Sequence, residues 1–189
     1  GVLSESEQEF IEREVFVPIV DALRREDIEY KGVLYAGLIM TAGGPKVLEF
    51  NCRFGDPETQ PLMMRLKSDL IEAIEATIDG RLDEITLEWD RRPALCVVMA
   101  SGGYPGEYEK GVPIEGLDRA ETISGTQVFH AGTTTIGGKP VTSGGRVLGV
   151  TALGEDVQQA RARAYEAVRA ISFKGAAVRG DIGMRVSEK

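Results

Sequence analysis

Two β-like segments separated by a glycine-rich turn constrain the fold of this chain more than any other feature of its sequence. Residues 30–41 (YKGVLYAGLIMT) are apolar on both alternating faces, as in a central strand that is covered on both sides. Residues 42–45 (AGGP) supply a turn, and residues 46–53 predict a second strand. The sequence therefore predicts a β-hairpin whose first strand is covered on both faces.

Helical patterns lie on either side of this hairpin. Residues 4–7 (SESE) have the spacing of a capping box, and apolar residues recur at helical intervals over residues 10–23. Pro18 interrupts the pattern, and because a proline inside a helix costs about 3 kcal/mol, we expect a kink or two short helices. After the hairpin, residues 56–57 (DP) are expected to begin a short helix, and residues 68–80 a longer one that Gly80 ends.

Composition changes near residues 91–93 (RRP), which we interpret as a boundary. Beyond it, short β-like runs are separated by glycines, and one late helical pattern follows. The sequence predicts an α/β (α+β) fold in two parts, residues 1–92 and residues 93–189.

Charge and cysteine content exclude several classes of protein. The formal charge of −8 is spread along the 189 residues, which argues against a nucleic-acid partner, because such binding rests on basic patches. Cys52 and Cys96 lie inside apolar runs, which suits reduced core thiols in a cytoplasmic protein. No run approaches the roughly 20 apolar residues that cross a bilayer, so no membrane partner is expected. The chain begins at Gly1 without a methionine, which suggests a cut through a longer protein.

The second predicted strand carries a row of polar side chains. Because side chains alternate along a strand, one face should hold Leu48, Phe50, Cys52 and Phe54, and the other Glu49, Asn51 and Arg53. The first set is expected to face the core. Neighbours in the polar row should lie about 6.6 to 7 Å apart, twice the rise per residue. That spacing leaves room for a cation and a phosphate chain above the strand.

The residue types in this row suit magnesium and phosphate. Magnesium takes oxygen ligands, commonly one or two protein groups with nucleotide phosphates and water. Glu49 offers a carboxylate oxygen, Asn51 an amide oxygen, and Arg53 can neutralise charge on a transferring phosphoryl group. Spacing alone leaves an alternative open, in which the row is the solvated face of an amphipathic strand with an ion pair along it.

Longer motifs around the row decide between these interpretations. Residues 30–38 (YKGVLYAGL), 48–51 (LEFN) and 53–60 (RFGDPETQ) together resemble the phosphoribosylamine–glycine ligase family. The pattern Glu-x-Asn-x-Arg recurs across ATP-grasp enzymes, whereas its extension through residues 54–60 is specific to this ligase family. The resemblance covers nearly the whole chain and continues through residues 129–133 (FHAGT), 142–148 (TSGGRVL) and 181–183 (DIG).

This resemblance implies a fold, a reaction and a set of site residues. The fold is the C-terminal part of an ATP-grasp domain followed by a small mixed α/β C-terminal subdomain. Glu49 and Asn51 would ligate Mg²⁺ or Mn²⁺ on ATP, and Arg53 would face the reacting phosphates. The reaction joins glycine to 5-phosphoribosylamine through a glycyl phosphate, giving glycinamide ribonucleotide in purine biosynthesis. The family enzyme also has an N-terminal domain and an ATP-covering lid, so this chain is expected to be inactive by itself.

Two further residues are candidates for substrate binding. Asp56 follows the strand and could contact the amine-bearing substrates, but an acid at this position could equally cap a helix. Arg146, after two glycines, could hold the 5′-phosphate of the substrate with backbone amides, although a glycine pair before a strand is commonly a simple turn.

Two other functions remain open from the sequence. The chain could derive from another ATP-grasp ligase, such as a biotin-carboxylase relative, although residues 55–60 (GDPETQ) argue against this. It could also be a noncatalytic module that serves in assembly.

Overall fold

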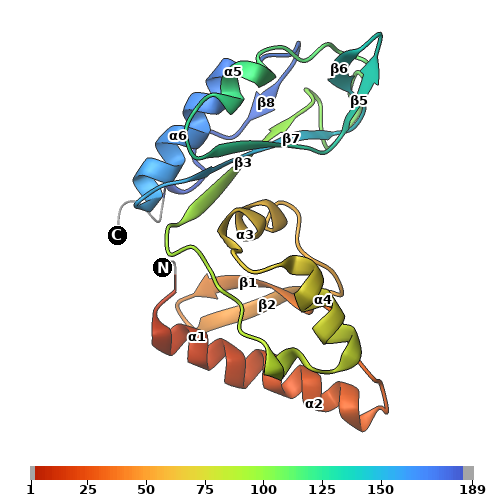
Figure 1. Cartoon of the computed structure of the whole chain (residues 1–189), viewed down its shortest axis with the longest axis vertical. Coiled ribbons are helices and arrows are strands. Elements are labelled where there is room, and N and C mark those ends of the chain that lie inside the picture. Colours follow the sequence, from red (N-terminus) through yellow and green to blue (C-terminus); the bar gives the residue numbers. More distant parts are fainter. Residues whose placement is uncertain (1–2, 185–189) are drawn as a thin grey trace. The chain divides into compact units, whose positions relative to one another are not determined.

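The computed structural model describes residues 3–184, and the chain divides into two compact units (Figure 1). One unit comprises the residues up to Gly55 together with Ser68–Glu88. The other comprises Asp56–Lys67 and the residues from Trp89 onward. The segment Asp56–Lys67, which the sequence division assigns to the first part, therefore packs with the second unit.

The first unit begins with an interrupted helix. The capping box is confirmed: the hydroxyl of Ser4 accepts a hydrogen bond from the Glu7 amide, and the Glu7 carboxylate accepts one from the Ser4 amide. Helix α1 (Glu5–Ile11) runs into a π-helical turn, η1 (Glu12–Phe16), and then into α2 (Val17–Arg25). Pro18 lies in the first turn of α2, directly after η1, whose wider turn gives the proline ring room that a regular helical turn would not. The expected interruption is thus a wide turn placed just before the proline.

The hairpin is confirmed, and its residues pair as antiparallel strands. Strand β1 (Tyr35–Thr41) pairs with β2 (Gly44–Asn51), starting at Thr41 opposite Gly44. The pairing shifts by one residue between Gly37 and Leu38, which leaves Leu48 as the extra residue of a β-bulge.

Several details expected of the hairpin are wrong. The first strand begins at Tyr35 instead of residue 30, and its outer half is exposed at Ile39 and Met40. Leu48 and Phe50, expected to face the core, are 69% and 41% exposed. These side chains are exposed because no other residue in the described part of the chain covers them on the two-stranded sheet β1-β2.

Like the hairpin, helix α4 (Leu70–Asp79) forms where the sequence predicts it, but its large apolar side chains are not buried. Asp69 caps its first turn through the Ile71 amide, and Gly80 ends it in the left-handed conformation with a φ of 73°. The expected apolar face, however, is exposed at Ile71, Ile74 and Ile78, whereas the buried positions are two alanines, Ala73 and Ala76. The short helix η2 (Leu82–Glu84) follows.

The second unit contains a four-stranded antiparallel sheet in the order β4-β7-β3-β8 (Figure 1). Helices α3 and α6 both pack against β3 and β7. A hairpin of two short strands, β5-β6, and the short helix α5 complete the unit. The bounds are α3 (Thr59–Arg65), β3 (Ala94–Ala100), α5 (Leu117–Glu121), β4 (Thr126–His130), β5 (Thr133–Ile136), β6 (Lys139–Thr142), β7 (Arg146–Leu153), α6 (Val157–Ala170) and β8 (Ala177–Val178).

The core of this unit lies between the sheet and α6. Alternate residues of β3 are buried there, and Val97 and Val150 are completely inaccessible. Helix α6 presents alanines to the sheet at positions 160, 164 and 167, whose small side chains allow a close approach. Asp156 caps the helix through the Gln159 amide at 2.7 Å.

Two further sequence expectations concern the cysteines and the membrane. Cys52 is exposed, so it is not the core thiol that was expected, while Cys96 is half-buried on β3. Within residues 3–184 the helices are all too short or too polar to cross a membrane.

The β3–β7 core predicts unequal effects of the same substitution at two valines. Val150→Ala removes two methyl groups from a completely buried site and should lower the free energy of unfolding of the second unit by about 2 to 3 kcal/mol. The matched change Val178→Ala, at a site that is 37% exposed, should cost less than about 1 kcal/mol. Urea unfolding of both variants measures the difference, and equal losses would contradict this account of the core.

Candidate functional site

The predicted metal ligands lie on β2, in the first unit. Glu49 is exposed and Asn51 is half-buried, and both follow the bulge at Leu48, so strand alternation places them on one side. Strand β2 ends at Asn51, so the polar row is shorter than expected. Arg53 lies two residues beyond it, exposed, and donates a hydrogen bond to the Phe54 carbonyl oxygen at 2.8 Å.

A glycine on the neighbouring strand makes room for Glu49. Gly37 lies opposite Glu49 in the hairpin register. A Cβ atom built on Gly37 would lie 2.9 Å from Cγ of Glu49 and 3.5 Å from its Oε1 oxygen. The side chain of Glu49 therefore extends across the space that a larger residue at position 37 would fill, and it carries its carboxylate over the hairpin surface.

These groups fit a divalent ion that shares its coordination with a ligand. Among residues 3–184 there is no group of three or more histidine, cysteine, aspartate or glutamate residues that could hold a metal by themselves. Glu49 and Asn51 together offer one carboxylate and one amide oxygen, which is a donor set that suits magnesium when phosphates and water supply the rest. In the described part of the chain, Glu49 and Arg53 do not form the ion pair that the alternative interpretation expects.

The two candidate substrate residues lie together in the second unit. Nη1 of Arg146 donates to the backbone carbonyl oxygen of Asp56 at 2.7 Å and lies 3.3 Å from its carboxylate oxygen Oδ2. Asp56 precedes α3, and Arg146 is the first residue of β7, so residues 90 positions apart form this contact. Asp56 does not cap α3, because the N-cap residue is Glu58, whose side chain makes no capping hydrogen bond.

Arg146 also borders a pocket of about 590 Å³ within the second unit. Side chains of Val98, Ala100 and Val178 give it an apolar lining, and Arg179 contributes a second guanidinium group. Arg179 forms an ion pair with Asp181 at 2.6 Å. The pocket therefore combines an apolar surface with two arginines, which suits a small anionic ligand.

Sequence reasoning missed Tyr104 as a member of this pocket. The glycine-rich segment 101–106 reads as a connecting turn, and Tyr104 as a packing residue. In the structure Tyr104 lines the pocket, and its ring covers the backbone of Gly145 so closely that a Cβ there would overlap it. An aromatic residue inside a glycine-rich segment was the available signal, but only the fold shows that Gly145 is its neighbour.

Electrostatic effects in the pocket follow from these contacts. The side chain of Tyr104 is the largest cause that raises the pKa of Arg146, and the charge of Asp56 raises it further against the effect of burial. Burial is also the largest cause that raises the pKa of the Cys96 thiol, with the charges of Asp56 and Glu58 adding to it and the neighbouring Thr151 side chain opposing it. The pocket thus holds a fully charged guanidinium beside a protonated thiol.

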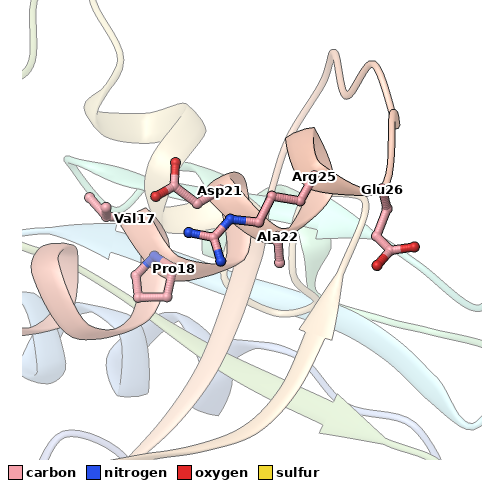
Figure 2. A pocket seen from close by; sticks show the side chains of 6 residues that line it. All are labelled: Val17, Pro18, Asp21, Ala22, Arg25 and Glu26. Atoms are coloured by element: carbon pink, nitrogen blue, oxygen red, sulfur yellow. The ribbon is translucent and has the colours of Figure 1, made fainter.

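A second hollow, of about 520 Å³, runs along the exposed surface of α2 (Figure 2). Its lining residues come from α2 and its C-cap residue Glu26, and Arg25 extends back along the helix toward Pro18 (Figure 2). None of the predicted site residues lies there.

Solved structures define the class of protein. A crystal structure of phosphoribosylamine–glycine ligase from Thermotoga maritima matches 95% of this chain and 44% of its own length, with a TM-score of 0.79 and 33% identity. N5-carboxyaminoimidazole ribonucleotide synthetase from the same organism shares the fold at a TM-score of 0.61 and 18% identity, over 90% of this chain and 43% of its own. The family model "Phosphoribosylglycinamide synthetase, ATP-grasp (A) domain" matches residues 1–59, which places the chain in the ATP-grasp class.

The particular family follows from a second model. "Phosphoribosylglycinamide synthetase, C domain" matches residues 94–185, so two models of one family cover most of the chain. The chain therefore belongs to the phosphoribosylglycinamide synthetase family. The expected fold class, an ATP-grasp portion followed by a mixed C-terminal part, is confirmed.

Curated relatives agree with this family. Phosphoribosylamine–glycine ligase from Rhodopirellula baltica is 54% identical over 182 residues, which are 96% of this chain and 42% of the relative. The ligase from Allochromatium vinosum is 57% identical over 176 residues, or 93% of this chain and 41% of the relative. The chain thus spans about two fifths of the length of the relatives it matches.

The burial of Cys96 predicts that the two thiols react at different rates. With Ellman's reagent at pH 7.5, the exposed Cys52 should react at least about tenfold faster than Cys96, whose raised pKa leaves less thiolate. The rate of the slow phase should increase as the pH rises toward the pKa of Cys96. Cys52→Ser should remove only the fast phase, and two thiols of equal rate would contradict the burial of Cys96.

Proposed function

We propose that the chain is part of an enzyme that ligates glycine to 5-phosphoribosylamine, using ATP and giving glycinamide ribonucleotide, ADP and phosphate. The observation that carries the proposal is the Glu49-Asn51 row, held over Gly37 and followed by residues 53–60 (RFGDPETQ). The names of relatives at more than half identity support the same reaction. We therefore infer that the parent enzyme acts in purine biosynthesis.

In this proposal the β2 row handles the nucleotide. Glu49 and Asn51 would hold a divalent ion, Mg²⁺ or Mn²⁺, on the phosphates of ATP. The ion, when bound, neutralises phosphate charge and polarises the terminal phosphoryl group. Arg53 would place its guanidinium near the transferring phosphoryl group, because a planar cation with several N–H donors stabilises charge on the equatorial oxygens.

The reaction proceeds in two balanced steps. A carboxylate oxygen of glycine attacks the terminal phosphorus of ATP, giving glycyl phosphate and ADP. The amine of phosphoribosylamine then attacks the acyl carbon, phosphate leaves, and the amine loses a proton as the amide forms. Activation divides a difficult condensation into two feasible reactions. The share of the protein is to position the reactants and to stabilise charge.

Asp56 and Arg146 would bind the amine-bearing substrate. Arg146 carries the charge that a 5′-phosphate requires, beside a pocket of suitable size. The carboxylate of Asp56 is exposed, so it can contact a substrate ammonium or amine while its backbone carbonyl still holds Arg146.

We infer that residues 1–92 belong to the ATP-grasp domain and residues 93–189 to the C-terminal subdomain, and that an N-terminal region completes the enzyme. The exposed apolar side chains of the first unit support a missing partner, since Leu48, Phe50 and Ile71 would normally be covered. A two-stranded sheet is also marginal by itself. The complete enzyme would be cytoplasmic, and this chain by itself would be inactive.

The decisive test measures phosphate release that depends on ATP, glycine and phosphoribosylamine. We expect activity from the chain combined with its N-terminal region, none from the chain alone, and a loss of at least about 100-fold in the combined sample carrying Glu49→Ala with Asn51→Ala. The loss arises because the nucleotide phosphates lose both protein oxygen ligands of their ion. Full activity of this double variant after verified assembly would contradict the assignment of Glu49 and Asn51 as metal ligands.

Two further variants sharpen this test. Gln8→Ala with Glu9→Ala removes the same two functional groups from exposed positions of α1 and should keep activity within about twofold. Gly37→Ala leaves Glu49 in the chain but pushes its side chain aside, so it should raise the KM for ATP by about tenfold. An assembled but inactive wild-type enzyme would favour the noncatalytic module.

A further inference from the structure

The ring of Tyr104 forms one wall of the pocket in the second unit and lies against the strand start that carries Arg146. A Cβ on Gly145 would overlap the Tyr104 ring and would lie 2.6 Å from its Cε2 atom. Gly145 has no left-handed backbone requirement, so its lack of a side chain serves this contact. The ring can cover the backbone next to Arg146 only because residue 145 is glycine.

The segment that carries Tyr104 is tied to the same strand start. The backbone amide of Ser101 donates to the Gly145 carbonyl oxygen at 2.8 Å, and its hydroxyl donates to the Gly144 carbonyl oxygen at 2.9 Å. The amide of Tyr104 in turn donates to the Ser101 carbonyl oxygen at 3.1 Å. Ser101 is 4% exposed, so these bonds are protected from water. Tyr104 and Arg146 therefore belong to one hydrogen-bonded assembly.

The guanidinium group of Arg146 has two polar neighbours, the acidic Asp56 and the uncharged Tyr104. Asp56 accepts from Nη1 through its backbone carbonyl and lies near the guanidinium through its carboxylate. Tyr104 lines the same pocket, with its ring against the neighbouring Gly145, and its side chain is the largest cause that raises the pKa of Arg146. A guanidinium has five N–H donors in one plane, so the contact with the Asp56 carbonyl oxygen leaves donors for the Tyr104 hydroxyl and for a ligand.

The chemistry of Tyr104 suits this task better than a second carboxylate would. A carboxylate that oriented Arg146 would also repel a bound phosphate, which reduces the gain from the arginine. The hydroxyl of Tyr104 orients the guanidinium without adding negative charge. An arginine that is already ordered also loses less conformational freedom when a ligand binds.

We propose that Tyr104 is a positioning residue that holds the Arg146 guanidinium ready for the phosphate group of a sugar phosphate bound in this pocket. The inference rests on the proposed function, because that function supplies a ligand with a 5′-phosphate. It goes beyond that function by assigning the glycine-rich segment 101–106 to substrate recognition.

The test compares two measurements on the same variants. The first is the affinity of this chain for ribose 5-phosphate, measured by titration calorimetry. The second is a full set of KM and kcat values for the enzyme completed with its N-terminal region. Tyr104→Phe keeps the ring and removes the hydroxyl, so it should weaken ribose 5-phosphate binding by about three- to tenfold. It should raise the KM for phosphoribosylamine equally and leave kcat and the KM values for glycine and ATP within twofold.

Gly145→Ala provides an independent disturbance of the same contact. It keeps the Tyr104 hydroxyl but displaces the ring, so it should reproduce the effect of Tyr104→Phe. Two matched controls should bind like the wild type. Tyr108→Phe keeps the ring that packs against Tyr104, with 6.3 Å between the ring centroids, and removes a hydroxyl outside the pocket lining. Gly180→Ala adds a Cβ into open space. Thermal unfolding of every variant identifies a loss that comes from instability.

The outcomes separate this inference from the proposed function. Ligase activity with Tyr104→Phe indistinguishable from wild type in both measurements would overturn the role of Tyr104 and leave the proposed function standing. A rise in all three KM values together would also overturn it, because a general structural role would be sufficient. If the completed enzyme has no ligase activity, the proposed function fails, and the titration with ribose 5-phosphate alone tests the role of Tyr104. Binding to the wild-type chain that Tyr104→Phe weakens would support the inference. An absence of binding to the wild-type chain would overturn it.

Discussion

The antiparallel pairing of β3 with β7 determines where the pocket of the second unit can form. In this register Ala100, the last residue of β3, lies opposite Arg146, the first residue of β7. The segment that leaves β3 must therefore run beside the segment that enters β7, although they are more than 40 positions apart in the sequence. The Ser101 hydrogen bonds and the Tyr104 ring occupy this junction, and they depend on a register that the buried valines of both strands fix.

The two units differ in how completely they bury their own apolar side chains. The second unit buries alternate residues of its sheet against an alanine-rich helix face, so its strands are covered by residues of the same chain. The first unit has well-formed local structure, including a capping box, a closed hairpin and a left-handed helix stop at Gly80. It nevertheless leaves large apolar side chains such as Leu48 and Ile71 in contact with solvent. Local hydrogen bonds thus define its elements, whereas the hydrophobic residues that it buries in the described structure are few: Ile11, Ala73 and Ala76.

This difference explains what the sequence could and could not predict. The hairpin, the Ser4 cap and the end of α4 depend on neighbours within a few residues, and all three were predictable. The burial of β1 was not predictable. Apolar residues on both faces of a strand indicate that it is stable when covered, but they do not show whether this chain contains the residues that cover it. The polar row is shorter than expected for a similar reason: pairing requires both strands, and β1 begins at Tyr35, opposite Asn51. Asp56 and Arg146 were each identifiable as candidates, but their contact depends on α3 packing with the second unit. Tyr104 could be assigned only from the fold.

The charges around the pocket give a physical reason to expect that it binds phosphate monoesters better than singly charged ligands. Both of its arginines already have carboxylate neighbours, Arg146 with Asp56 and Arg179 with Asp181, and all four side chains are exposed enough for water to screen these pairs. A ligand with a single dispersed negative charge gains little by replacing such a neighbour. A phosphate monoester carries more charge and three acceptor oxygens, so it can compete for the guanidinium N–H groups without displacing the Asp56 carbonyl contact. The hydroxyl of Tyr104 is uncharged, so it does not repel the phosphate as a further carboxylate would.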